Sequence, residues 1–200
     1  GFTAAIGLTG ASYLRHQEGA TRKLAEQQLS TVADLKAHEI RRWYRENLAD
    51  AGHIVDAGFA ARAVREFLVR PEDREARIQV ERWLSSLHAR YDFARLVLLD
   101  KNLQARLAFP YAEGWVGPLA QQRATEAMRG RRVVVSDLHR SSVSGKINMD
   151  LLVPLLESGG EPVGLVMIEL LPETYLFPLI KSWPTPSRTA ETLVVLCEGD

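Results

Sequence analysis

The sequence predicts an α+β fold, in which a long N-terminal helix precedes a largely antiparallel sheet with flanking helices. Between Arg15 and about Val69, apolar residues recur with a mean spacing close to 3.6, which is typical of a helix. From Tyr91 onward the period changes, and short apolar runs alternate with turn-forming residues, which is typical of strands. Because hairpin connections make neighbouring strands antiparallel, helices and sheet form separate layers.

The long helix is expected to run without a break, since no proline occurs from Gly1 to Arg70 and only Gly52 and Gly58 weaken it after Gly19. A helix of this length with one apolar stripe needs a partner along most of its length. A second copy of the chain can supply that partner, so we predict a homodimer through this helix. The predicted dimer-interface residues are Leu29, Val32, Ile40 and Trp43.

Residues 1–14, "GFTAAIGLTGASYL", carry no charge before Arg15. This run is shorter than the roughly 20 apolar residues that cross a bilayer. It also lacks the basic region that opens a signal peptide. We therefore expect residues 1–14 to be the end of a transmembrane helix that anchors the chain in a membrane. The alternative is an apolar N-terminal helix of a soluble protein.

Pro71 is expected to end the long helix, and a second helix is predicted over Glu72–Tyr91. "FARLVLLD" and "LQARLAFP" are predicted strands, joined by a turn at Asp100–Lys101–Asn102. The next helix is predicted in "GPLAQQRATEAMRGRR", with Pro118 in its first turn and Gly130 as its C-cap.

Three more strands are predicted in "VVVSDLHRSS", "INMDLLVPLLE" and "PVGLVMIEL". A short helix at Leu176–Ile180 follows and is broken by Pro184 and Pro186. A last strand is expected at Thr192–Cys197. A lone strand at a terminus has no neighbour for its backbone N–H and C=O groups, so we expect the chain to be a fragment in which this strand begins a second module.

The composition argues against several function classes. The 25 basic and 25 acidic residues leave no basic excess, so nucleic-acid binding is not predicted. The single cysteine, Cys197, excludes an internal disulfide and Cys-based zinc sites. The five histidines are scattered, and no nucleophile elbow or glycine-rich phosphate loop occurs. We predict no catalytic residue, no metal and no cofactor.

A ligand-binding pocket is the remaining prediction. Tyr111 and Trp115 can supply an aromatic wall, while His139, Arg140 and Asp150 lie near strand ends of the same predicted sheet. Arg140 can bind a carboxylate and Asp150 an ammonium group. The alternative is structural, with Trp115 covering the core and Arg140 paired with Asp150.

Serines close to His139 raise one enzymatic alternative, a soluble serine hydrolase. The loop holds Ser141, Ser142 and Ser144. Hydroxyls in a Ser/Gly loop are more typical of turns than of catalysis, so a non-catalytic role is favoured.

Four stretches resemble the extracytoplasmic double-Cache sensor domains, also called PDC or PAS-like domains, of bacterial transmembrane receptors. They are "LSTVADLKAHEIRRWYRENLADA", "DLHRSSVSGKINMDLLVPLL", "EPVGLVMIEL" and "YLFPLIKSWPTPSRTAETLVVLCEGD". The resemblance covers about Leu24 to Asp200, and the string "SWPTPSRTAET" is its most specific part. None of these stretches matches a ligand signature of the family clearly.

The resemblance implies a domain organisation. After the membrane segment, residues 15–91 would form the long helix and the second helix, and residues 92–183 the membrane-distal PAS-like sensor module. Residues 184–200 would be a linker and the first strand of a truncated second module.

The resemblance also implies a function. The domain would lie at the bacterial inner membrane, facing the periplasm or cell exterior. There it would bind a small molecule and relay the signal to a cytoplasmic histidine kinase or diguanylate cyclase, without being an enzyme itself. The alternative of a different class is a dimerisation stalk that senses nothing.

Overall fold

The computed structural model describes residues 2–55, 58–91, 93–110, 116–141, 145–183 and 192, with side chains from Gly19 onward except at Ala20 and Val55. The chain divides into two compact units. One consists of residues 43–178. The other combines Gly1–Arg42 with Leu179–Asp200, and it is described separately below. The strand predicted at Thr192–Cys197 lies outside the described residues, apart from Thr192.

The predicted long helix is described as two helices, α1 (Phe2–Val55) and α2 (Gly58–Val69). Continuity of the predicted helix to Val69 depends on residues 56–57, which lie outside the described residues. Gly58, the first residue of α2, is one of the two weak points noted in the sequence, since glycine is a poor helix former. A separate short helix can pack its own apolar side, and α2 buries Ala60, Ala61, Ala63, Val64 and Phe67.

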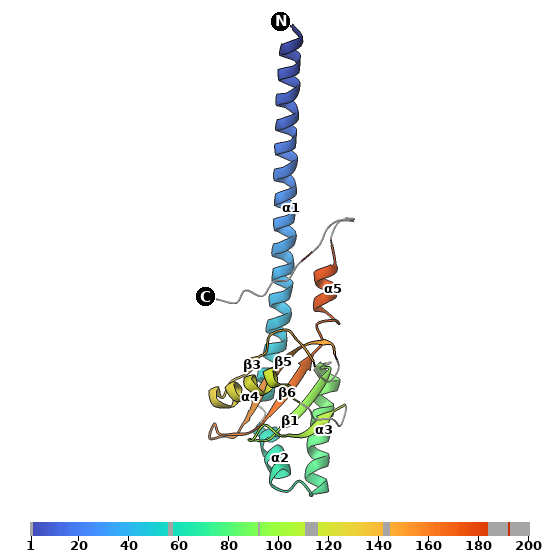
Figure 1. Ribbon diagram of the computed structural model, residues 1–200. Coiled ribbons are helices and arrows are strands. Elements are labelled where there is room, and N and C mark those ends of the chain that lie inside the picture. The colour runs from blue at the N-terminus through green and yellow to red at the C-terminus, as the bar shows by residue number, and fades with distance from the viewer. Residues whose placement is uncertain are drawn as a thin grey trace. The chain divides into compact units, whose positions relative to one another are not determined.

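The described residues form one antiparallel sheet of six strands in the order β2-β1-β6-β5-β3, with β4 also paired to β5 (Figure 1). The strands are β1 (Arg95–Leu99), β2 (Ala105–Phe109), β3 (Val134–Val135), β4 (His139–Arg140), β5 (Ile147–Leu156) and β6 (Pro162–Leu170). The remaining helices are α3 (Arg74–Tyr91), α4 (Pro118–Gly130) and α5 (Leu176–Lys181). The predicted α+β architecture is confirmed.

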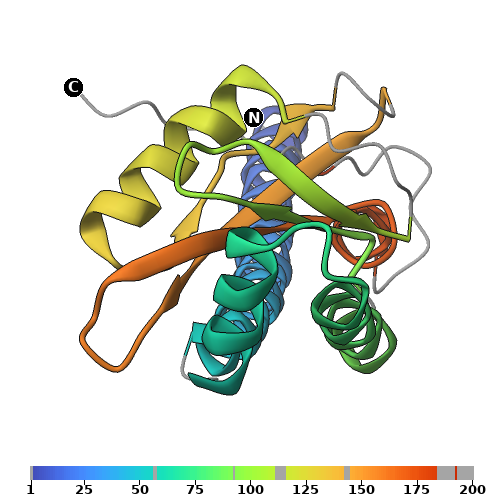
Figure 2. The same ribbon diagram turned by 90° about the horizontal axis from the view of Figure 1, so that it is seen from below.

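Both faces of the central strands are buried, so β5 and β6 are almost continuously apolar. Figure 2 shows α4 on one face of the sheet and α2 and α3 on the other. Leu96, Ile168 and Leu151 belong to the core between the sheet and the helices α2 and α3. Val97 and Met167, one position along in β1 and β6, belong to the smaller core beneath α4. The alternation of side chains along each strand thus divides the interior into two layers.

Two local predictions were wrong. The residue in the left-handed conformation after α4 is Arg131, with φ 52°, and Gly130 is the last residue of the helix instead of its C-cap. "VVVSDLHRSS" forms two short strands instead of one. Between them the Ser136 N–H donates to the Asp150 carbonyl (2.8 Å), and the Asp150 N–H donates to the Ser136 hydroxyl (2.8 Å). Because a side chain takes the place of a backbone acceptor at Ser136, the regular strand ends there.

Gly164 in β6 is the position where the sheet tolerates no side chain. A Cβ added there would lie 2.6 Å from the Leu99 carbonyl oxygen on the neighbouring strand. We expect Gly164→Ala to lower the free energy of unfolding by about 1–3 kcal/mol, as overpacking does in well-packed cores. Urea denaturation measures this, with Gly159→Ala as the control because a Cβ at Gly159 meets nothing within 4 Å. Equal stability of the two variants would contradict the close approach.

In the unit formed by Gly1–Arg42 and Leu179–Asp200, Lys36 is the buried polar residue of α1, only 7% exposed. Its ammonium group donates to the Ile180 carbonyl and to the Thr192 hydroxyl (2.9 Å), and it lies 5.0 Å from the centre of the Trp183 ring. These contacts connect α1 to the segment after β6.

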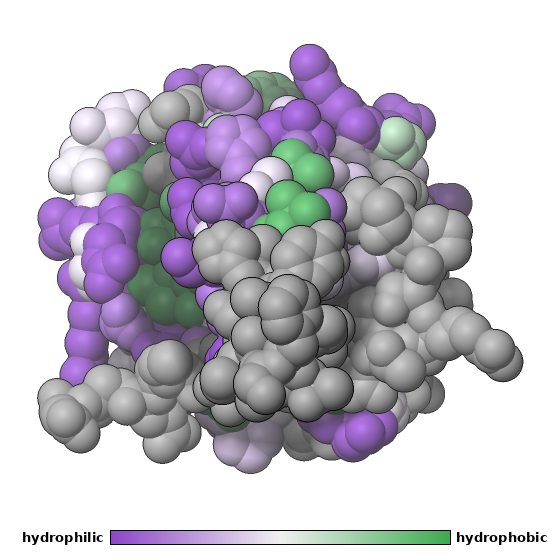
Figure 3. Space-filling view, turned by 90° about the horizontal axis from the view of Figure 1, so that it is seen from above, coloured by the Kyte–Doolittle hydropathy of each residue, from purple (hydrophilic) through white to green (hydrophobic). Residues whose placement is uncertain are grey.

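Where the described surface is visible in Figure 3, hydrophilic residues predominate. None of the helices, searched over the described residues, has the length and apolar character needed to cross a membrane. The side chains of residues 1–14, where the end of a transmembrane helix is expected, lie outside the described residues.

Candidate functional site

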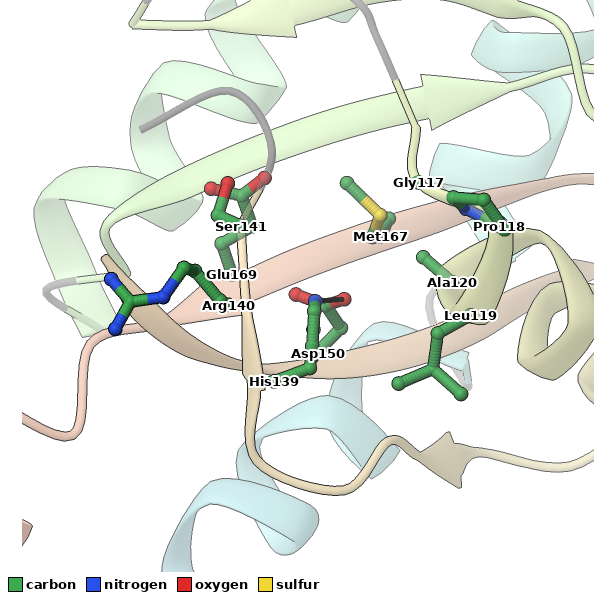
Figure 4. Close-up of a pocket in the computed structure, with 10 residues that line it drawn as sticks. All are labelled: Gly117, Pro118, Leu119, Ala120, His139, Arg140, Ser141, Asp150, Met167 and Glu169. Atoms are coloured by element: carbon green, nitrogen blue, oxygen red, sulfur yellow. Dashed lines mark ion pairs between the residues drawn. The ribbon is translucent and has the colours of Figure 1, made fainter. Parts of the chain in front are cut away.

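A cavity of about 290 Å³ lies on the α4 face of the sheet, at the first turn of that helix. Strands β4, β5 and β6 and the N-terminus of α4 supply its walls (Figure 4). The residues that line it are Gly117, Pro118, Leu119, Ala120, His139, Arg140, Ser141, Asp150, Met167 and Glu169. Its volume is at the lower end of the range for small-molecule sites.

A row of charged residues crosses three strands beside the cavity, and two of them, Glu169 and Asp150, line it. Arg95, Glu169 and Asp150 are direct cross-strand partners on β1, β6 and β5, so their side chains share one face of the sheet. The Arg95 guanidinium donates to a Glu169 carboxylate oxygen at 2.7 Å, and both side chains are nearly buried. Asn148 donates to the other Glu169 oxygen at 3.3 Å. Glu169 is therefore paired with Arg95.

Asp150 is paired with His139 instead. The His139 Nε2 lies 3.3 Å from Asp150 Oδ2, and its Nδ1 lies 3.1 Å from the Asp137 carbonyl oxygen. A carbonyl can only accept, so Nδ1 carries a proton. The contact between Nε2 and Oδ2 then needs one further proton, held either by the imidazole or by the carboxyl group.

Burial makes Asp150 an unusual carboxyl group. It is 2% exposed, and its Oδ1 has no hydrogen-bond partner among the described residues. Burial raises the pKa of Asp150 to about 7; the Glu169 charge adds to the rise, while His139 and Arg95 oppose it. Near neutral pH, this group can therefore release its proton to solvent, and a cation in the cavity would favour the carboxylate form.

The N-terminus of α4 supplies the opposite polarity on the facing wall. Gly117 is its N-cap and makes no side-chain capping hydrogen bond, and Pro118 has no N–H. The first N–H groups of an α-helix have no carbonyl partner within the helix, so those of Leu119 and Ala120 can bind an anion. The cavity accordingly combines the Asp150 carboxyl group with the N–H groups at the start of α4.

Three solved structures have a similar fold. The ligand-binding domain of the Campylobacter jejuni chemoreceptor Tlp3, in complex with 4-methylisoleucine, matches 80% of this chain with a TM-score of 0.57 and 13% identity. That of the Pseudomonas aeruginosa PAO1 amino acid chemoreceptor PctC, in complex with GABA, matches 79% with a TM-score of 0.55 and 19% identity. That of the Pseudomonas fluorescens chemoreceptor CtaA, in complex with L-alanine, matches 76% with a TM-score of 0.50 and 16% identity. The chain has the fold of a bacterial chemoreceptor ligand-binding domain.

The expected Cache-type fold is thus confirmed. This chain spans 64%, 65% and 62% of the three chemoreceptor domains, respectively. No protein-family model matches its sequence, and no curated protein matches it either.

Three of the five predicted ligand-binding residues line one cavity. His139 and Asp150 are brought together at its floor. Arg140 also lines it, but Figure 4 shows its guanidinium directed away from Asp150, and it donates to the Gly145 carbonyl oxygen at 2.5 Å. The predicted aromatic wall, Tyr111 and Trp115, lies outside the described residues.

Sequence reasoning missed several residues of the site. Glu169, Arg95 and Asn148 are polar residues inside otherwise apolar strands, and this pattern is the signal that could have found them, because buried charges need partners. Met167 and the α4 N-terminus gave no such signal. Their place in the site depends on strand register and on how α4 packs, which local sequence does not encode.

The serine hydrolase alternative gains no support from this geometry. Both ring nitrogens of His139 are already close to oxygen atoms of Asp150 and Asp137, so the imidazole is not placed as a base toward Ser141. Across the described residues, no group of three His, Cys, Asp or Glu side chains is arranged to hold a metal ion.

Proposed function

We propose that the chain is a ligand-sensing domain of a membrane-bound receptor, and that it binds a small molecule bearing an ammonium group in the Asp150 cavity. The observation that carries the proposal is the buried Oδ1 of Asp150, which lines that cavity and has no hydrogen-bond partner among the described residues. An ammonium group supplies a hydrogen-bond donor to this oxygen together with a positive charge.

The anion-binding end of α4 narrows the ligand class to amino acids and related zwitterions. With the ammonium at Asp150, a ligand carboxylate can reach the N–H groups of Leu119 and Ala120. GABA, L-alanine and 4-methylisoleucine, found in the structures of similar fold, all combine an amino group with a carboxylate. These likenesses support the class of ligand and not a particular member of it.

Calorimetric titration of the purified chain with amino acids and amines tests the proposal. We expect Asp150→Asn to weaken binding of the best ligand about 10- to 100-fold, since a hydrogen bond to a charged group contributes about 1.5–3 kcal/mol. Asp137→Asn is the matched control, because Asp137 is an aspartate between β3 and β4 whose side chain is half exposed and does not line the cavity. The absence of any ligand among amines, amino acids and organic acids would favour a stalk that senses nothing.

The proposal places the domain outside the cytoplasm of a bacterium, anchored in the inner membrane through residues 1–14. Binding would favour one arrangement of the module and its long helix, and a cytoplasmic kinase or cyclase would respond. The signal cannot exceed the difference in ligand affinity between the two states, typically ~1–3 kcal/mol.

The proposal also includes a homodimer through α1, where Leu29 is 54% exposed and Val32 and Ile40 are partly exposed. We expect Ile40→Glu to lower the dimer fraction in sedimentation, because a charge would enter an apolar contact between helices. The control is Leu24→Glu, an exposed position on the opposite side of the helix at 3.6 residues per turn. A dimer that is unchanged in Ile40→Glu would argue against this face. Trp43, the fourth predicted interface residue, packs on the core of its own chain and stacks with Tyr175.

A further inference from the structure

A second cavity of about 410 Å³ lies on the other face of the sheet. Its walls come from α1, from the end of α3 and the loop after it, and from the segment that follows β6. It shares no lining residue with the Asp150 cavity. Its buried wall residues Phe93 and Leu170 belong to the core on the α2 and α3 side of the sheet, whereas Ala120 and Met167 of the Asp150 cavity belong to the core beneath α4. The proposed sensing function does not use it.

Aromatic rings make up much of this second cavity. Trp43 on α1 and Tyr175 after β6 lie nearly parallel, with an interplanar angle of 12° and ring centres 6.4 Å apart. Tyr91 and Phe93 form a second stacked pair with centres 5.3 Å apart. All four residues line the cavity. The faces of aromatic rings carry partial negative charge, and they attract cations within about 6 Å.

Two carboxylates lie among these rings. Glu46 and Asp50 are four residues apart on α1, so they lie on one side of the helix and repel each other. Asp50 is partly buried, and no ion pair or hydrogen bond joins its side chain to any residue that the structure describes. Burial is the main cause that raises its pKa, and the Glu46 charge adds to the rise.

The basic groups near Asp50 do not neutralise it. His53 and Arg90 attract its charge from a distance, but neither forms an ion pair with it. The Arg90 guanidinium lies 5.6 Å from the centre of the Tyr91 ring, and His88 presents an edge-on contact to Phe109. Among the residues that the structure describes, the carboxylate of Asp50 therefore lines a cavity walled by aromatic rings and has no direct ion-pair partner.

We propose that this second cavity binds a small organic cation of the alkylated ammonium class. Its alkyl groups would contact the rings of Trp43, Tyr175 and Tyr91, and its charge would face Asp50 and Glu46. Alkylated ammonium fits better than a metal ion, because aromatic walls cannot supply the several oxygen ligands that hard metal ions need. A cation held there connects α1 to both segments that approach it, from α3 and from β6.

Titration with tetraethylammonium chloride, followed by calorimetry and by amide NMR shifts, tests the proposal. Sodium chloride at equal ionic strength is the blank. We expect binding to the wild-type chain, with shifts concentrated at Asn47, Ala94 and Thr174. Asp50→Asn should weaken this binding about tenfold, and Tyr175→Leu about 3- to 30-fold, as cation–π contacts contribute about 0.5–2 kcal/mol.

Two control variants separate this site from others. Asp150→Asn removes the carboxylate of the first cavity and should bind tetraethylammonium as the wild type does. Asp34→Asn removes an exposed carboxylate of α1 outside the cavity, and it should leave the affinity for tetraethylammonium unchanged. Loss of binding in Asp150→Asn with none in Asp50→Asn would overturn the proposal, and so would the absence of any shift at Asn47 and Thr174 in the folded wild type. Because the shift map needs no variant, the test holds even if Tyr175→Leu does not fold.

Discussion

Replacing Arg95 with methionine is expected to lower the free energy of unfolding by about 3–5 kcal/mol, because the change leaves Glu169 buried without its partner. The ion pair is almost completely shielded from solvent, since the Arg95 and Glu169 side chains are 6% and 12% exposed. Methionine retains most of the apolar volume of the arginine stem. The loss of unfolding free energy therefore measures the removal of the positive charge and not the creation of a cavity. Urea denaturation at neutral pH measures the difference.

A second ion pair of the same chemistry supplies the control for Arg95. Arg65 and Glu157 lie 3.1 Å apart, but their side chains are 53% and 37% exposed. Arg65→Met should cost less than about 1 kcal/mol, because water solvates the remaining carboxylate. The double variant Arg95→Met, Glu169→Met should recover much of the stability, since no buried charge is left uncompensated. If Arg95→Met proves as mild as Arg65→Met, Glu169 is not held by Arg95 in the way described.

The elements of the fold could be predicted because each has a local signal. The switch from helical spacing to short apolar runs at Tyr91 corresponds to the end of α3 and the start of β1. The turn predicted at Asp100–Lys101–Asn102 forms, with the Asp100 carboxylate accepting the N–H groups of Asn102 and Gln104. The start of α2 at Gly58 could only be suspected, since a glycine weakens a helix without deciding how the next segment packs.

The candidate site could be predicted only in part, because its assembly depends on register between strands. His139 and Asp150 were named from their places at strand ends, and pairing of β4 with β5 brings them together. Arg95 and Glu169 lie beside them because the register of β1, β6 and β5 makes Arg95, Glu169 and Asp150 cross-strand neighbours. No short stretch of sequence encodes that register. The orientation of Arg140, whose guanidinium turns to Gly145, likewise depends on the chain around it.

Asp150→Asn is expected to stabilise the ligand-free chain, and by more as the pH rises. The pKa of Asp150 is about 7 in the folded chain against 3.8 for an ordinary aspartate. The folded state therefore holds a proton that the unfolded state has released, and wild-type stability falls as the pH rises from about 4 to about 7. Asparagine does not titrate. Between about pH 5 and about pH 8 the variant should gain about 2–3 kcal/mol of unfolding free energy relative to wild type, at 1.36 kcal/mol per pKa unit. Denaturation at a series of pH values measures it.

Ser136→Ala separates this titration from general disturbance of the site. It removes the hydroxyl that accepts the Asp150 N–H, yet it adds and removes no titratable group. Its stability should differ from wild type by a constant amount, so the pH slope is unchanged. A stability difference for Asp150→Asn that does not vary with pH would mean that Asp150 carries no proton near neutrality. A variant that is both more stable and unable to bind amines would identify the buried carboxylate as a functional group, because its burial costs stability that only a ligand restores.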